Sequence, residues 1–196
     1  MLELRDVTFS YDQKPILKDF SLTLADGEIL AVMGPSGCGK STLLSLCAGL
    51  LRPQKGFVIS SFDRISFVFQ EPRLLPWLTV RENLAAVLKK TDGIEEIITD
   101  ALDSVELSDC KNLYPEELSG GMKSRVSLAR ALIFDGDLFL FDEPFAALDE
   151  ELRKRIGAEM RRHLKEKGAA AIFVTHQLSD AEMMADRILY LPSTNT

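Results

Sequence analysis

A glycine-rich loop carries the clearest chemistry of the chain, Gly34-Pro-Ser-Gly-Cys-Gly-Lys40-Ser41. Glycines at this spacing let the backbone curl so that successive N–H groups point at phosphate oxygens, and a following helix adds its positive end. In such a loop Lys40 meets the β- and γ-phosphates of a nucleotide, and the Ser41 hydroxyl ligates Mg²⁺. A glycine turn with an incidental lysine is the alternative, but the flanking strand and helix patterns disfavour it. The expected nucleotide-contacting residues of the loop are Gly34, Pro35, Ser36, Gly37, Cys38, Gly39, Lys40, Ser41 and Thr42.

Two adjacent carboxylates, Asp142 and Glu143, follow the strongly apolar run at 138–141. An acidic pair in this place is usually no more than the end of a strand. The residue types also allow a second interpretation, in which Asp142 holds the Mg²⁺ shell and Glu143 takes a proton from an attacking water. The two motifs together favour hydrolysis of a nucleoside triphosphate.

A second anion-binding feature precedes a helical pattern that runs from Met122 to about Phe134. Ser119, Gly120 and Gly121 stand at its start, where unpaired backbone N–H groups and the helix dipole can bind a phosphate. Because the glycine loop already provides one complete phosphate cradle, this second site requires another nucleotide.

The pentapeptide Leu118-Ser-Gly-Gly-Met122, combined with the glycine loop and followed by a basic helix, resembles the signature of the ATP-binding-cassette (ABC) family. The resemblance continues into 144–149, which is similar to that family's D-loop, and covers nearly the whole chain from Leu2 to Leu191. It implies ATP and Mg²⁺ as cofactors and a head-to-tail homodimer. In such a dimer each signature loop closes on the γ-phosphate held by the other copy.

The same resemblance implies roles for residues that carry little signal of their own. Gln70 matches the Q-loop, which senses the γ-phosphate, and His176 matches the switch histidine. Tyr11 stands where the family places an aromatic ring on adenine, and Asp149 would contact the second copy. Outside this context Gln70 and His176 would be ordinary solvated residues. The expected catalytic residues are Lys40, Gln70, Glu143 and His176, and the expected metal ligands are Ser41, Gln70 and Asp142.

The stretch from Phe67 to Asn83 looks much like the ATPase subunits of bacterial importers for nitrate, taurine, alkanesulfonates, bicarbonate and thiamine-precursor pyrimidines. In those importers it lies against the coupling helix of a membrane permease. Pro72, Pro76 and Trp77 would give it a stiff apolar surface, unless Trp77 is simply part of the core. The resemblance thus implies permease subunits as partners and, indirectly, an extracytoplasmic solute-binding protein.

The chain departs from that family in three places. The segment between Gly56 and Gln70 is shorter than usual, which predicts a trimmed accessory β-region. Ser124 stands where relatives commonly have a glutamine, so contacts near the ribose are expected to differ. The chain also stops soon after its expected last strand, at 187–191, so regulation through a C-terminal extension is not expected.

Two other functions compete with the importer. A soluble ABC ATPase acting on DNA or ribosomes typically joins two cassettes or carries large insertions, and a net charge of -7 provides no basic field for nucleic acid. A regulatory cassette that only binds nucleotide would need a damaged site, yet Lys40, Asp142, Glu143 and His176 are all present. The importer is favoured, and nucleic acid is not an expected partner.

The composition is typical of a soluble globular protein. Its 196 residues, 46% of them hydrophobic, can bury roughly 70% of their unfolded surface. The three cysteines have no paired spacing, which indicates a reducing compartment. No apolar stretch is long enough to span a bilayer, and the chain begins without a leader pattern. We expect a protein that is soluble when isolated and peripheral at the cytoplasmic face of the cell membrane.

The densest basic run, Arg153-Lys-Arg155 continuing to Arg161-Arg-His163, alternates with glutamates at helical spacing. This pattern is typical of a solvated helix face. Arg153 and His163 are therefore expected to face water.

The hydrophobic periodicity predicts an α/β fold with a mainly parallel sheet and a helical insertion. The resemblance to the ABC family implies that this fold is a P-loop NTPase core with a small antiparallel β-region and a helical signature subdomain. Asp26-Gly27 between two apolar runs is a hairpin signal, and Thr79 with Glu82 forms a capping box. We expect one domain over 1–196, with 1–71 and 134–196 as the nucleotide-binding core and about 72–133 as the helical subdomain. The expected strands are 2–9, 29–33, 138–141, 170–174 and 187–191, and the expected helices include 41–51, 94–105 and 150–167.

Overall fold

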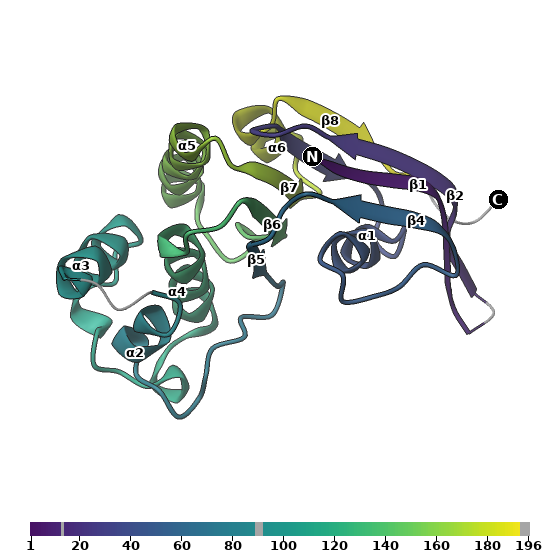
Figure 1. Cartoon of the computed structure of the whole chain (residues 1–196). Helices are drawn as coiled ribbons and strands as arrows, with labels where there is room; N and C mark the ends of the chain where they lie inside the picture. The colour runs from purple at the N-terminus through teal and green to yellow at the C-terminus, as the bar shows by residue number, and fades with distance from the viewer. Residues whose placement is uncertain (13, 89–91, 193–196) are drawn as a thin grey trace.

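The computed structural model describes residues 1–12, 14–88 and 92–192. A parallel sheet with strand order β5-β6-β7-β3-β8 lies at its centre (Figure 1). Three of its strands consist only of buried residues, as expected for strands covered on both faces. The strands are β3 (Ile29–Met33), β5 (Ile65–Val68), β6 (Leu138–Asp142), β7 (Ala170–Val174) and β8 (Arg187–Tyr190).

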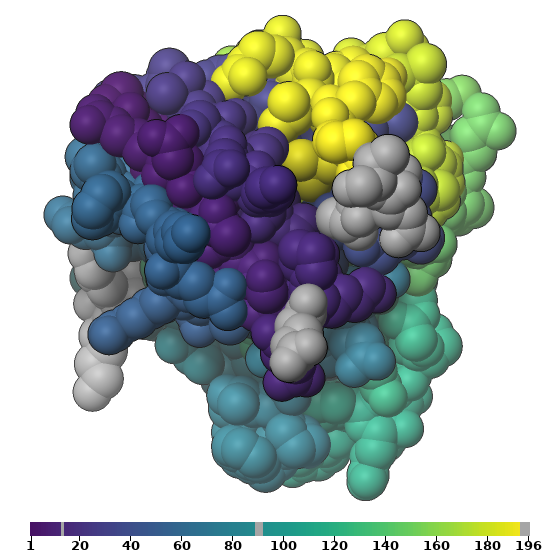
Figure 2. All heavy atoms as spheres, turned by 90° about the vertical axis from the view of Figure 1, so that its right-hand side faces the viewer, coloured from purple at the N-terminus to yellow at the C-terminus, as the bar shows by residue number. Residues whose placement is uncertain are grey.

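A second, antiparallel sheet has strand order β2-β1-β4, with β1 at Leu2–Tyr11, β2 at Lys14–Leu24 and β4 at Lys55–Ser60. Figure 2 looks onto this side of the molecule, where the purple N-terminal strands lie between a blue segment and the yellow C-terminal segment. Only residues 61–64 separate β4 from β5, so the β-region is as short as the sequence indicated. The expected turn after β1 includes Gln13, which lies outside the described residues.

The hairpin expected at Asp26-Gly27 is wrong. These residues do form a turn, but β2 pairs with β1 in the antiparallel sheet, whereas β3 pairs with β7 and β8 in the parallel one. The residues of β3 are buried throughout, and a strand that is covered on both faces fits only inside the central sheet. Turn residues do not specify which sheet the next strand joins.

Alternate residues of the parallel strands face two different cores. Leu30, Leu140 and Ile172 pack with the antiparallel sheet and helix α1 (Lys40–Cys47). Ala31 and Phe173 pack with the helices on the opposite face. Those helices are α2 (Val80–Ala85), α3 (Ile94–Ser104), α4 (Gly120–Ile133), α5 (Glu150–Lys167) and α6 (Leu178–Met184), with short 3₁₀ turns η1 (Ser108–Cys110) and η2 (Pro115–Glu117) between α3 and α4. The α/β fold class is confirmed.

The start of α2 and the end of α5 follow their local chemistry. The Thr79–Glu82 capping box begins α2, and Gly168, in a left-handed conformation, ends α5. The helix expected at 41–51 is shorter than predicted: α1 ends at Cys47, Gly49 turns left-handed with φ +70°, and Leu50 is exposed.

Helix α5 is less solvated than its charge pattern indicated. Lys154 pairs with Glu150 on the exposed face, but the Arg153 side chain is only 17% exposed. His163 is half-buried, and its burial lowers the pKa of the imidazole from the ordinary value. The expectation that Arg153 and His163 face water is therefore wrong, because each points towards the body of the protein.

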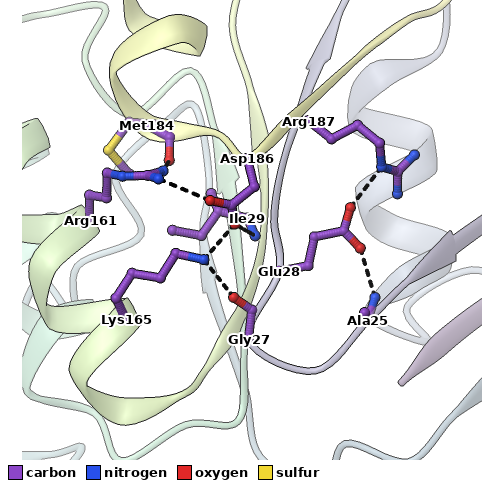
Figure 3. Close-up of polar contacts among 9 residues, drawn as sticks. All are labelled: Ala25, Gly27, Glu28, Ile29, Arg161, Lys165, Met184, Asp186 and Arg187. Atoms are coloured by element: carbon purple, nitrogen blue, oxygen red, sulfur yellow. Dashed lines mark hydrogen bonds and ion pairs between the residues drawn. The ribbon is translucent and has the colours of Figure 1, made fainter.

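An ionic cluster around Asp186 fastens α5 to the sheet (Figure 3). The carboxylate accepts hydrogen bonds from the Ile29 N–H and from Arg161, both at 2.9 Å. Lys165 donates to the same carboxylate at 2.5 Å and to the Gly27 carbonyl at 2.8 Å. Burial alone would raise the pKa of Asp186, but these hydrogen bonds outweigh it and hold that pKa below the usual value.

Among the described residues, no helix combines the length and the apolar character that crossing a membrane requires.

Candidate functional site

The glycine loop connects β3 to α1 in a conformation that side chains would obstruct. Gly34 has φ +155°, and a Cβ there would lie 2.6 Å from the Leu191 carbonyl oxygen. Gly39, which caps α1, has φ +103°, and its Cβ would lie 2.7 Å from Cγ2 of Ile16. Both positions therefore require glycine. Gly37 also has a positive φ, but a Cβ there would meet open space.

Lys40 folds back across this loop. Its side chain is 8% exposed, and Nζ donates hydrogen bonds to the carbonyl oxygens of Gly34 and Pro35, both at 2.9 Å. Nζ also lies 4.0 Å from Sγ of Cys38. The loop thus carries a nearly buried positive charge, which suits an anionic ligand.

Asp142 ends β6 beside the start of α1. Burial raises the pKa of its carboxyl above the ordinary value. A hydrogen bond from Ser41 and the charge of Lys40 act in the opposite direction, while the charge of Glu143 raises the pKa further. A buried carboxylate paired with a hydroxyl is a reasonable oxygen-ligand set for Mg²⁺.

Glu143 comes directly after β6 and is held in a left-handed conformation with φ +49°. Its N–H donates to the Val174 carbonyl at 3.1 Å, so the backbone is tied to the end of β7. His176 follows β7, and its Nδ1 lies 3.3 Å from Oε2 of Glu143. A non-glycine residue in this conformation is strained, and such strain concentrates at functional sites.

A cavity of about 490 Å³ lies over the glycine loop, within the size range of nucleotide and cofactor pockets. It brings together most of the residues expected to contact the nucleotide: Tyr11, Ser36, Gly37, Gly39, Lys40, Ser41, Thr42, Gln70 and Glu143. Tyr11 is 49% exposed and packs edge-on against Phe9, with ring centroids 5.0 Å apart. Lys14 and Ile16 also line the cavity. Sequence reasoning missed both, since no motif marks the start of β2.

The residues expected to ligate Mg²⁺ could hold the ion only together with the phosphates of a bound nucleotide. Among residues 1–12, 14–88 and 92–192, no group of three or more His, Cys, Asp or Glu side chains could hold a metal ion. Ser41, Gln70 and Asp142 together supply one carboxylate. Mg²⁺ commonly binds through one or two protein ligands, phosphate oxygens and waters, so this set fits that pattern.

The signature residues lie apart from this cavity, since none of them lines it. Ser119 is exposed and caps α4, accepting a hydrogen bond from the Met122 N–H at 3.2 Å. The helix begins at Gly120 rather than at Met122. Gly120 is exposed, and a Cβ there would meet open space. Ser124 turns its hydroxyl back to the Gly120 carbonyl at 3.2 Å.

The chain is similar to known proteins over most of its length. The family model described as ABC transporter matches residues 17–146. The aliphatic sulfonates import ATP-binding protein SsuB of Bacillus licheniformis is 41% identical over 184 residues, which cover 90% of this chain and 72% of SsuB. The nitrate import ATP-binding protein NrtC of Synechococcus elongatus is 42% identical over 188 residues, which cover 89% of this chain but only 28% of NrtC.

Solved structures show the same fold. The dimeric structure of MJ0796, a bacterial ABC transporter cassette, superposes with a TM-score of 0.88 at 30% identity, covering 98% of this chain and 94% of that one. A dimeric post-hydrolysis state of MJ0796 bound to ADP and Pi gives a TM-score of 0.86 at 31% identity, covering 97% and 94%. The match to the family model and the identity to SsuB show that the chain is a member of the ABC transporter family.

Proposed function

We propose that the protein is the ATP-hydrolysing subunit of a membrane importer and works as a head-to-tail homodimer. The dimer is supported by two separate places on one chain that are expected to bind phosphate. One is the glycine loop, and the other is formed by Ser119 and Gly120, which are exposed and do not line the cavity over that loop. A second copy would bring its signature loop to the first copy's nucleotide. The dimeric state of the related cassette MJ0796 supports this arrangement.

The residues in and around the cavity would have different roles in binding and hydrolysing ATP. Lys40 and the loop N–H groups would hold the phosphates, and Tyr11 would stack on the base. Mg²⁺, when bound, neutralises charge on the phosphates, and Ser41, Asp142 and Gln70 would hold it. Glu143 would accept the proton of the attacking water, and His176 would hold the γ-phosphate. Pro35, Cys38, Gly34 and Thr42 complete the cradle.

The helical segment from about 72 to 133 would form the second part of the domain, with 1–71 and 134–196 as the core. Its docking segment, which we define as residues 73–79, presents Trp77 with 70% of its surface exposed. The fully buried Asn83 holds this segment: Oδ1 accepts from the Leu75 N–H at 2.8 Å, and Nδ2 donates to the Leu78 carbonyl at 3.0 Å. A rigid, exposed apolar surface suits a permease contact.

The signature helix reaches the same segment. Arg130 of α4 donates to the Arg73 carbonyl at 2.8 Å, and burial lowers the pKa of Arg130. A movement of α4 would therefore be transmitted through Arg130 to the docking segment and from there to the permease. The import names of SsuB and NrtC support a permease partner and a small solute of the sulfonate or nitrate class. An extracytoplasmic binding protein would deliver that solute to the permease. The working place would be the cytoplasmic face of the membrane.

Replacement of the general base tests the enzymatic part. Glu143→Gln should abolish ATP turnover while ATP binding persists, because the amide cannot accept the proton but leaves the cradle intact. Glu166→Gln, an exposed glutamate on α5, is the control. A Glu143→Gln protein that turns over ATP near the wild-type rate would remove Glu143 from this role.

Purification from membranes tests the transport part. The full chain should be recovered with a multi-span permease, and Trp77→Glu should weaken that recovery without lowering ATP binding. Recovery with ribosomes or DNA in place of a permease would support the alternative, a soluble ABC ATPase.

A further inference from the structure

Arg153 makes contacts that the assigned site does not use. It is the fourth residue of α5, and its guanidinium points back to the two loops that follow β6 and β7. One amino group donates to the Leu148 carbonyl at 3.0 Å. The other donates to Oε1 of Gln177 and lies 3.8 Å from Oδ1 of Asp180.

These contacts fall beside two functional residues. Leu148 directly precedes Asp149, which caps α5 and is expected from the family resemblance to contact the second copy. Gln177 directly follows His176. A single guanidinium therefore ties the D-loop to the segment that carries the switch histidine, within one chain.

Two further hydrogen bonds link Thr175, Gln177 and Asp180 around His176, and we call these three residues the polar frame. The Thr175 hydroxyl accepts a hydrogen bond from the Gln177 N–H at 3.0 Å and donates to Asp180 at 3.4 Å. Thr175 and Asp180 are both buried, whereas His176 between them is 57% exposed. The position of the imidazole thus depends on the buried residues that flank it, and Arg153 contacts two of the three polar groups of this frame.

Stability alone does not account for Arg153. Its side chain is 17% exposed, and Nε has no hydrogen-bond partner among the described residues. A buried ion pair with an unsatisfied donor is commonly no more stable than an apolar replacement. An arginine here is better explained by the two loops that it joins.

We propose that Arg153 is a positioning residue for ATP hydrolysis, which acts through Gln177 to keep His176 beside Glu143 and through Leu148 to keep the D-loop in register with it. The inference rests on the proposed roles of Glu143 and His176. Arg153 does not touch the nucleotide cavity. Its loss should therefore change the rate of hydrolysis and leave ATP binding intact.

The test compares steady-state ATPase kinetics of Arg153→Ala, Gln177→Ala and the double variant. A displacement of a reacting group of about 1 Å can cost about a hundredfold in rate, so Arg153→Ala should lower kcat at least about tenfold while KM for ATP stays within about twofold. Gln177→Ala should lower kcat less. The double variant should be no worse than Arg153→Ala, because both changes break the same link. Arg162→Ala, an exposed arginine of the same helix, should be unaffected.

Three results would overturn the proposal: an Arg153→Ala kcat within twofold of wild type, a rise in KM with kcat unchanged, or losses that multiply in the double variant. Should Arg153→Ala fail to fold, Gln177→Ala and Arg153→Lys decide instead. Both must then lower kcat several-fold at unchanged KM, and wild-type rates in both would contradict the link. Failure of the proposed function is seen separately, as a Glu143→Gln protein that still turns over ATP.

Discussion

The imidazole Nδ1 of His176 lies 3.3 Å from the carboxylate Oε2 of Glu143, at the end of the parallel sheet where β6 and β7 both stop. The pair combines an exposed histidine with a mostly buried glutamate whose backbone is left-handed. The contact places the proposed proton acceptor, Glu143, next to the proposed γ-phosphate ligand, His176.

Loss of His176 should therefore reduce turnover. We expect His176→Ala to lower kcat by about a hundredfold or more, the size of effect typical of residues that act on the transition state, with a smaller change in KM. His163→Ala is the matched control, since this histidine of α5 lines no part of the nucleotide cavity. An unchanged kcat in His176→Ala would show that the pair has no part in hydrolysis.

Alanine substitutions should have different effects on stability and ATP binding at Gly34 in the glycine loop and at Gly120 in the signature loop. Gly34→Ala forces a Cβ to within 2.6 Å of a backbone oxygen at positive φ, so we expect a loss of about 1–3 kcal/mol in unfolding free energy and weaker ATP binding. Gly120→Ala meets no atom within 4 Å and should be neutral or slightly stabilising. Urea denaturation and fluorescent-ATP binding measure both effects. Equal stability of the two variants would contradict the cradle geometry.

Thiol reagents should act on the cradle through Cys38. Its side chain is 2% exposed, so N-ethylmaleimide should inhibit ATP hydrolysis slowly, when the loop opens. Cys47 is buried with a pKa raised to about 12 by that burial, which makes it inert. Cys38→Ala should be resistant to inhibition, and ATP should protect the wild-type protein. Equal inhibition of Cys38→Ala would place the reactive thiol elsewhere, at Cys110.

The Asp186 cluster should make stability depend on pH in the acid range. Because the folded-state pKa of Asp186 lies below the unfolded value near 3.8, its stabilisation is present above that value and is lost as the pH falls through the folded-state pKa. Asp186→Asn should cost about 1–3 kcal/mol at pH 7, an amount reduced by the partial exposure of the cluster, and progressively less below pH ~4.

Urea denaturation of wild type and Asp186→Asn, at pH 7 and below pH ~4, measures how the cost in unfolding free energy changes with pH. Glu166→Gln, in an exposed pair of α5, should show little effect at either pH. A cost of Asp186→Asn that stays constant between the two pH values would contradict the pKa direction.

Much of the fold follows from local patterns. The bounds of α5 and β7 were predicted to the residue, because Asp149 and Gly168 cap the helix and the strand is continuously apolar. The hairpin at Asp26-Gly27 failed because a turn signal is local, whereas the sheet that a strand joins depends on burial of both its faces.

In the site, too, some residues could be predicted from local patterns and others depend on the tertiary fold. The glycine loop and the Asp-Glu pair have fixed spacing, so their residues could be named from the sequence and lie together. Arg153 could not be identified in this way, since a run of helical charges does not reveal which member turns inward. Lys14 and Ile16 reach the cavity only because β2 folds back on β1.

Sedimentation of Glu143→Gln in MgATP shows whether the active unit is a dimer in which each signature loop binds the other copy's ATP. We expect a dimer that binds two ATP molecules. Adding Gly120→Glu should leave a monomer that still binds ATP, because a carboxylate there repels the partner's γ-phosphate, while an acidic residue in the first turn of α4 does not harm the helix. A monomer in both proteins, or a dimer in both, would show that the signature loop does not bind the other copy's ATP.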